Sequence, residues 1–203
     1  MDLEADIRRA EIKLAELDTR LGALIKLQRP LTLRPRGGYF FSLCRSIIGQ
    51  QVSVASASAI FGRLEAATGL DPAAVAHLTD EAARAIGLSR QKTSYVRDLA
   101  RHFMDNPAVY NHLERSSNEA VITELTIIKG IGVWTAQMFM MFTLRRLDVF
   151  APDDVGLQRA MKQLYGWDIL PDKSALAGIT ERWRPYRTVA CWHLWESLHN
   201  APV

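Results

Sequence analysis

The residues best suited to chemistry lie between positions 125 and 154. Residues 129–132, Lys-Gly-Ile-Gly, separate two apolar helical patterns. Glycine permits a tight turn and close approach of a ligand to the backbone, and the amides that begin a helix favour an anion such as phosphate. Residues 152–154, Pro-Asp-Asp, then place carboxylates at the start of the next helical pattern. A phosphate-binding turn followed by an acid indicates an enzyme that binds nucleic acid and acts on it.

Each of these patterns also has a simpler interpretation. A Gly-x-Gly sequence often does no more than join two helices, and an aspartate after proline is an ordinary helix cap. The flanking residues Leu125, Ile128 and Ile131 on one side and Trp134 on the other favour the ligand-binding hairpin. Two adjacent acids allow one carboxylate to cap the helix and the other to do chemistry.

Composition narrows the classes of protein and site. The chain has 203 residues and a formal net charge of +3, which permits a nucleic-acid partner without requiring one. Cys44 and Cys191 are the only cysteines, which excludes a four-cysteine metal or iron–sulfur site, and we expect two buried free thiols. The sequence shows no secretory signal and no apolar run of about 18 residues. We therefore predict an intracellular protein without a membrane partner.

The elements that must position these groups are helices, and the predicted fold class is all-α. An apolar stripe from Leu3 to Leu24 predicts one helix, packed on its own domain rather than in a coiled-coil dimer. No run of alternating strands is evident. The further helical windows span residues 39–48, 53–67, 80–86, 90–103, 117–127, 155–164, 173–183 and 185–198, with a short helix starting at 71.

Four segments together carry a resemblance to a known family. Besides the hairpin, they are residues 45–53 (Arg-Ser-Ile-Ile-Gly-Gln-Gln-Val-Ser), 148–155 (Asp-Val-Phe-Ala-Pro-Asp-Asp-Val) and the C-terminal stretch 181–195. They resemble the helix–hairpin–helix DNA glycosylase superfamily, closest to its alkylpurine (3-methyladenine DNA glycosylase II) branch, in a compact form without the N-terminal β domain. The resemblance extends from about Leu3 to Trp195.

The resemblance implies a single domain over residues 1–203, built of two helical lobes that flank a DNA-binding cleft. The hairpin motif spans about residues 125–136. The lobes are expected from about residues 39–145 and from 1–38 with 146–203.

It also implies roles for individual residues. Asp154 is expected to be catalytic, and Asp153 to cap the helix or support the site. The base pocket is expected to be formed by Trp134, Trp195, Tyr39 and Phe40. Met138 and Val155 stand where some relatives have aromatic residues, so the pocket is less aromatic here. Relatives that also cut the DNA strand carry a lysine nucleophile where this chain has Trp134.

The expected DNA contacts come from two segments. Their residues are Gln50, Gln51, Lys129, Gly130, Gly132 and Thr135. Either glutamine could enter the gap left by a flipped nucleotide. No catalytic metal is expected, but the hairpin carbonyls of Thr126, Ile128 and Ile131 could hold a monovalent cation. His193 is expected to be a hydrogen-bonded structural histidine rather than a catalytic one.

The implied activity is that of a monofunctional glycosylase without a cofactor. It would act as a monomer on double-stranded DNA that contains alkylated purines, and leave an abasic site. Two alternatives stay open: a non-catalytic hairpin module that binds DNA, and a glycosylase for deaminated bases.

Overall fold

A computed structural model describes residues 2–33, 37–105 and 109–198. Within these ranges the regular secondary structure is entirely helical, so the predicted all-α fold is confirmed. Most of the helices begin at a side chain that caps the first-turn amides, which is why the sequence sets their starting points. These caps are Asp2, Asp18, Ser53, Asp71, Thr79, Ser117, Asp154 and Asp172.

The chain divides into two compact units. The first consists of residues 1–34 and 145–203, and the second of residues 35–144. The cleft predicted between two lobes stays a prediction.

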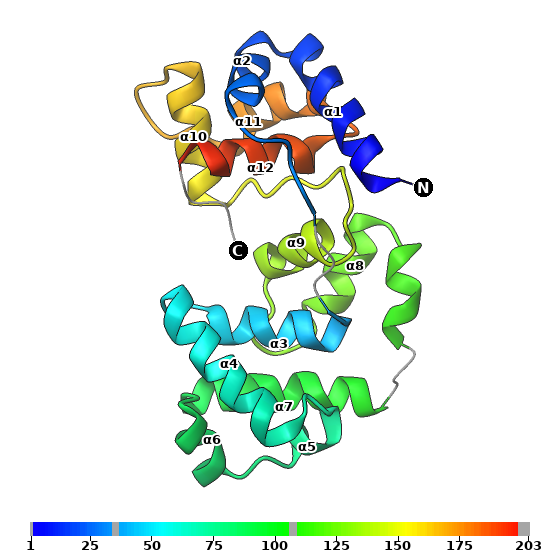
Figure 1. The fold of residues 1–203 in the computed structure, drawn as a ribbon, viewed down its shortest axis with the longest axis vertical. Helices are drawn as coiled ribbons and strands as arrows, with labels where there is room; N and C mark the ends of the chain where they lie inside the picture. Colours follow the sequence, from blue (N-terminus) through cyan, green and yellow to red (C-terminus); the bar gives the residue numbers. More distant parts are fainter. Residues whose placement is uncertain (1, 34–36, 106–108, 199–203) are drawn as a thin grey trace. The chain divides into compact units, whose positions relative to one another are not determined.

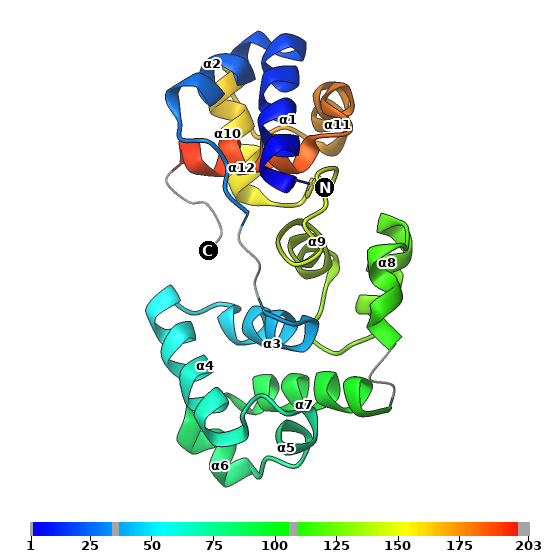
Figure 2. The same cartoon turned by 45° about the vertical axis from the view of Figure 1, so that its right-hand side comes forward.

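In the first unit, α12 packs against α1, α2 and α10, and α1 packs against α2 (Figures 1 and 2). The buried side chains of Leu14, Trp183 and Val189 belong to its core. Its helices are α1 (Leu3–Leu17), α2 (Thr19–Leu27), α10 (Val155–Tyr165), α11 (Lys173–Thr180), the 3-10 turn η2 (Glu181–Trp183) and α12 (Arg187–Ser197).

The predicted continuous helix from Leu3 to Leu24 is wrong, because Asp18 interrupts it. The Asp18 backbone is extended, and its Oδ1 accepts the amides of Arg20 and Leu21 to begin α2. Its Oδ2 accepts the Tyr165 hydroxyl at 2.5 Å and the Trp183 indole N–H at 3.2 Å. A short polar side chain that competes for backbone amides ends a helix even within an apolar stripe. The middle of the stripe is buried within the unit, as predicted, at Ile7, Ala10, Leu14 and Leu21, whereas Leu17 beside the break is 39% exposed.

In the second unit, α7 packs against α3, α5 and α6, and α9 packs against α3 and α8. Figure 2 shows α7 running beneath α3. Phe40 on α3 meets Phe103 on α7 edge to face, with ring centroids 5.2 Å apart. The helices are α3 (Tyr39–Gly49), α4 (Val54–Thr68), α5 (Pro72–Ala76), α6 (Asp80–Ile86), α7 (Arg90–Asp105), the 3-10 turn η1 (Val109–Glu114), α8 (Asn118–Leu125) and α9 (Val133–Phe142).

Both cysteines are buried free thiols, as predicted. Burial raises the pKa of the Cys44 thiol to about 12, and it raises the pKa of the Cys191 thiol as well. A thiol that stays protonated is a poor nucleophile and a poor metal ligand. Neither cysteine is therefore suited to chemistry.

Candidate active site and DNA-binding hairpin

The turn between α8 and α9 is the tight hairpin that the sequence predicts. Its Gly130 has φ +83°, a left-handed conformation that other residues rarely adopt. A Cβ built on Gly130 would lie 2.2 Å from the Tyr95 ring. Conformation and space therefore both require glycine at position 130.

Gly132 differs from Gly130 in both respects. It has φ −96°, and a Cβ at this position would meet nothing within 4 Å. It begins α9 as a cap without a side-chain hydrogen bond, so no side chain of its own covers the first-turn amides. The fold alone does not require glycine here, whereas a phosphate approaching these amides would.

Neighbouring helices hold the hairpin in place. On α7, Asp98 accepts the backbone N–H of Lys129 at 2.9 Å, and its carboxylate lies 3.6 Å from the Lys129 Nζ. The Lys129 side chain is otherwise solvent-exposed. Of the carbonyls expected to hold a monovalent cation, that of Ile128 already accepts the Ile131 N–H at 3.1 Å. The cation site stays a prediction.

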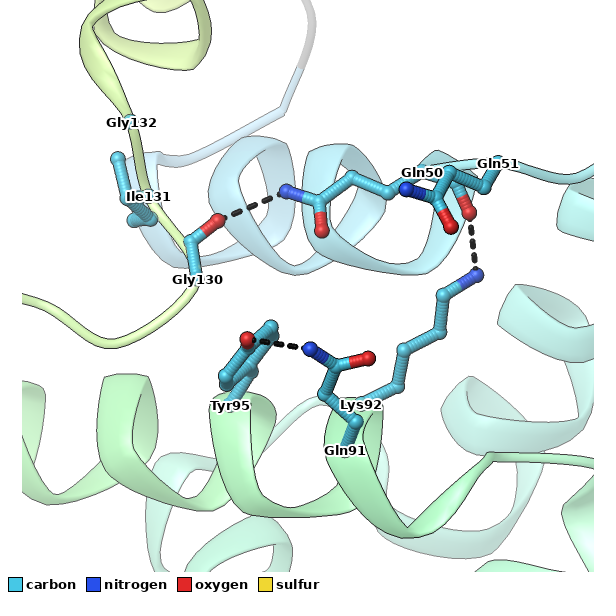
Figure 3. A pocket seen from close by; sticks show the side chains of 8 residues that line it. All are labelled: Gln50, Gln51, Gln91, Lys92, Tyr95, Gly130, Ile131 and Gly132. Atoms are coloured by element: carbon cyan, nitrogen blue, oxygen red, sulfur yellow. Dashed lines mark hydrogen bonds between the residues drawn. The ribbon is translucent and has the colours of Figure 1, made fainter.

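A polar cavity of about 360 Å³ opens beside the hairpin (Figure 3). Gln50 reaches across it, and its Nε2 donates to the Gly130 carbonyl at 2.8 Å. The Lys92 ammonium donates to the carbonyls of Ile48 and Gln50, both at 2.7 Å. Burial lowers the pKa of Lys92. The Gln50 bond thus joins the end of α3 to the hairpin, and the two Lys92 bonds join it to α7.

Gln51 follows this anchored segment with an exposed side chain and φ +56°. Of the two glutamines, Gln50 therefore serves the internal architecture and Gln51 projects from it. Sequence reasoning missed the contribution of α7, where Gln91, Tyr95 and Asp98 face the hairpin at helical spacing. Their i, i+4, i+7 pattern of polar residues on an otherwise packed helix was the available signal.

The carboxylate of Asp154 lies in the first unit at the start of α10. Its Oδ1 accepts the Leu157 amide at 2.7 Å and the Trp195 indole N–H at 3.0 Å. A Cβ on Gly156 would lie 3.0 Å from this oxygen and 3.3 Å from the indole nitrogen. The small residue at 156 thus leaves room for the indole to reach the acid.

The structure corrects one expectation at this acid. Asp154, not Asp153, caps α10, because the Asp154 side chain is the one that meets the Leu157 amide. Asp153 is exposed and pairs with Lys173 on α11 at 2.8 Å. Trp195 is only 2% exposed, and its expected role in stacking on the base stays a prediction. Its observed role is to orient Asp154.

The remaining expected pocket residues lie in the second unit. Trp134 in the first turn of α9 is 44% exposed, and its expected role in the base pocket stays a prediction. The Tyr39 hydroxyl donates to Glu114 at 3.0 Å, and its ring packs edge-on against Phe139. Phe40 is buried, and its expected role in the base pocket stays a prediction. Thr135 is also buried, so its side chain offers no surface to DNA.

His193 has the structural role that the sequence predicts. Its ring nitrogens lie 3.1 Å from a Glu11 carboxylate oxygen and 2.7 Å from the Gln28 side-chain oxygen. The same Glu11 oxygen accepts the Leu31 amide at 2.9 Å. This buried network ties α12 to α1 and to the segment after α2.

Comparisons with known proteins agree with this arrangement. Residues 44–185 match the model of the HhH-GPD superfamily base excision DNA repair proteins. The chain is 30% identical to DNA-3-methyladenine glycosylase 1 of Schizosaccharomyces pombe, over 97% of this chain and 90% of that protein. A crystal structure of DNA-3-methyladenine glycosidase from Bacillus halodurans is 41% identical with a TM-score of 0.83, covering 92% of this chain and 88% of that one.

A second solved structure is the 3-methyladenine DNA glycosylase Mag1 of Schizosaccharomyces pombe in complex with abasic DNA. It is 31% identical with a TM-score of 0.80, and the match covers 94% of this chain and 97% of that one. The family match covers more than half of the chain, and it includes the second half of α3, the hairpin and Asp154. The chain belongs to the HhH-GPD superfamily of base excision DNA repair proteins.

Proposed function

We propose that this protein is a monofunctional DNA glycosylase that flips alkylated purines out of duplex DNA and hydrolyses their glycosidic bond. The observation that carries the proposal is the Asp154 carboxylate, held through one oxygen by the Leu157 amide and the Trp195 indole. A purely structural cap needs the amide but not the buried indole. The names of the relatives, 3-methyladenine glycosylases among them, support the substrate class.

The proposed reaction needs little acid assistance. An alkylated purine carries positive charge, so the C1′–N bond can break with its electron pair leaving on the base. The sugar becomes oxocarbenium-like, and an adjacent carboxylate stabilises that charge. Water then forms the new bond to C1′ and gives up a proton, which Asp154 can accept or pass to solvent. The products are a free base and an abasic site.

The absence of strand cleavage is proposed from the residue at position 134. A lyase step needs an amine that forms a Schiff base with the sugar, and this chain has Trp134 where strand-cutting relatives have lysine. Lys129 is on the other side of the two hairpin glycines and lies beside Asp98. Lys129 is therefore assigned to the hairpin structure and not to a catalytic role.

Extrusion of the base requires a side chain to enter the stack. We assign this to Gln51, because its side chain is exposed whereas that of Gln50 is bonded to the hairpin. Lys92 supports the assignment, since its ammonium fixes the carbonyls on which the turn is built. For the flipped base, the exposed ring of Trp134 offers a stacking surface suited to a cationic purine.

The oriented carboxylate favours this proposal over a non-catalytic hairpin module, which would need the hairpin amides but no oriented acid. The test is base release from duplexes that carry 3-methyladenine or 7-methylguanine, beside duplexes with uracil or hypoxanthine. We expect release of methylpurines, with the strand intact until alkali is added. Release of deaminated bases alone would reassign the lesion, and trapping of a borohydride-stable adduct would contradict the monofunctional assignment.

The partner is duplex DNA, and the helices of the described residues include none long and apolar enough to cross a membrane. We propose that the enzyme acts as a monomer without a cofactor. Its location would be intracellular, with DNA in the cytoplasm and nucleoid or in the nucleus.

A further inference from the structure

A second cavity of the 35–144 unit is lined by an unusual number of arginines. It measures about 260 Å³ and lies where the end of α6 meets α7. Its charged lining consists of Arg84, Arg90, Arg97, Arg101 and Asp80. The formal excess of three positive charges equals the net charge of the whole chain, +3. Positive charge is therefore concentrated at this cavity.

One of these arginines has a structural role, and the other three do not. Arg97 donates to the Leu78 carbonyl and lies 2.8 Å from the Asp80 carboxylate, so the one acid of the cavity is already paired. Arg84, Arg90 and Arg101 are exposed, and none has a carboxylate partner within 4.0 Å among the described residues. Exposed cations gathered on one surface without acidic partners create a positive potential that attracts anions.

The position of the cavity on α7 suggests which anion that is. Arg90, Ser94, Arg97 and Arg101 follow each other at spacings of four, three and four, and so share one side of the helix. Gln91, Lys92 and Tyr95 on an adjacent side line the cavity beside the hairpin. The same helix thus carries both the hairpin support and the arginine row.

The dimensions of the row match a nucleic-acid backbone. From Arg90 to Arg101 the helix rises about 16 Å, at about 1.5 Å per residue. One DNA strand advances about 3.4 Å per nucleotide, so the row is about five nucleotides long. A guanidinium group binds phosphate oxygens through paired N–H donors.

We infer that Arg84, Arg90 and Arg101 form a second backbone site, which binds phosphates of the DNA flank beyond those held by the hairpin. This site adds affinity and extends the bound length of DNA without reading sequence. The inference rests on the proposed DNA substrate, but not on Asp154 or on which base is released.

The test compares two triple variants that remove the same charge. R84Q/R90Q/R101Q removes the exposed arginines and keeps Arg97 and Asp80, which hold the local structure. R8Q/R9Q/K13Q removes three cations from α1 in the other unit and is the control. Affinity for an undamaged 24-base-pair duplex is measured across salt concentrations. The single variants R90Q and R101Q provide the same readout if the triple variant does not fold.

We expect the slope of log affinity against log salt to fall by about 2–3 in R84Q/R90Q/R101Q, at about 0.9 for each phosphate that the protein no longer neutralises. The control should change the slope by less than the value for one phosphate. In duplexes centred on an abasic site, shortening the flank that the arginines bind should abolish the difference in affinity between the parent and R84Q/R90Q/R101Q. Shortening the opposite flank should preserve that difference.

Equal losses of affinity in both triple variants would show that only the net charge of the protein matters, and would contradict a specific arginine site. A deficit that is insensitive to trimming either flank would do the same. If poly-glutamate binding depends on the three arginines while the salt dependence of duplex affinity is unchanged in the variant, the surface would be assigned to an acidic protein instead of DNA. If the parent enzyme releases no methylpurine, the proposed function fails, while the salt slope still decides the arginine site.

Discussion

The indole nitrogen of Trp195 lies 3.0 Å from Oδ1 of Asp154, 41 positions away in the sequence. This bond turns a helix-capping carboxylate into an oriented one, because a second donor fixes the oxygen that the Leu157 amide already holds. Gly156 leaves space for the indole, since a Cβ there would lie 3.3 Å from its nitrogen. Trp195 is thus a positioning residue for the proposed chemistry.

Trp195→Phe should therefore slow base release and leave binding to abasic duplex near normal. The change keeps an aromatic ring and removes the donor, and hydrogen bonds to charged groups are worth about 1.5–3 kcal/mol. We expect the single-turnover rate to fall about 10- to 100-fold. Trp192→Phe, on the same helix α12, is the control. A matching loss of lesion binding with an unchanged rate would instead favour a stacking role for Trp195.

Asp154→Asn should abolish base release while the protein still folds and binds lesion DNA. Asparagine caps a helix about as well as aspartate, so α10 should keep its start, but the negative charge is removed. We expect the rate to fall by about 10²–10³-fold or more. Asp153→Asn, which changes only an exposed pair with Lys173, should have little effect. A larger loss in the Asp153 variant would transfer the catalytic role to that residue.

Gln51→Ala should reduce excision most from well-paired duplexes, where extrusion of the base costs most. Loss of a side chain that fills the gap should slow release about tenfold there, and less from mispaired lesions. The measurement is single-turnover release of the same alkylated base opposite its normal partner and opposite a mismatch. Val52→Ala, at the next exposed position, is a matched control. Equal losses on both duplexes would limit Gln51 to a role in the turn.

Acid should weaken the Glu11 network in the first unit. Burial alone would raise the pKa of Glu11, but hydrogen bonds from His193 and the Leu31 amide, with the charges of His193 and Arg8, lower it overall. A lowered carboxyl pKa stabilises the fold above the unfolded value and loses that contribution as pH falls through the folded one. Glu11→Gln should cost about 1.5–3 kcal/mol in urea unfolding at pH 7.

The cost of Glu11→Gln should shrink as pH falls below about 4.5, the range in which an ordinary glutamate takes up its proton. Glu16→Gln on the same helix changes an exposed pair with Lys13 and is the control. A cost for Glu11→Gln that stays constant from pH 7 to about pH 3.5 would show that the network does not depend on the charge of Glu11.

The all-α fold and the hairpin could be predicted from sequence because their signals are local. Glycines at 130 and 132 between apolar helical windows are a short-range pattern, as is an acid before α10. The break at Asp18 was also visible as a capping residue, but the apolar stripe continued across it. The spacing of apolar residues alone does not show where a polar side chain will compete for backbone amides and end a helix.

The interactions that assemble the site are not local, and sequence reasoning did not find them. Lys92 is 42 positions from the Gln50 carbonyl that it binds, and Trp195 is 41 positions from Asp154. Trp195 was expected only as a wall of the base pocket, and sequence reasoning did not predict that its buried indole donates to Asp154. Only the packing of α7 against α3 and of α12 against α10 brings these groups together.

Alanine substitutions at the two hairpin glycines should affect different properties: Gly130→Ala the stability of the fold, and Gly132→Ala the affinity for DNA. Gly130→Ala places a side chain at φ +83° and against the Tyr95 ring, so it should destabilise the protein by about 2 kcal/mol or more. Gly132→Ala has an ordinary φ and open space, so stability should change by less than about 1 kcal/mol.

If a phosphate approaches the start of α9, however, Gly132→Ala should weaken binding to lesion and undamaged duplex alike, because the phosphate belongs to the backbone and not to a base. Urea unfolding and duplex titrations of both variants measure the two effects. A stable Gly132→Ala protein that binds undamaged duplex like the parent would rule out a phosphate at this glycine.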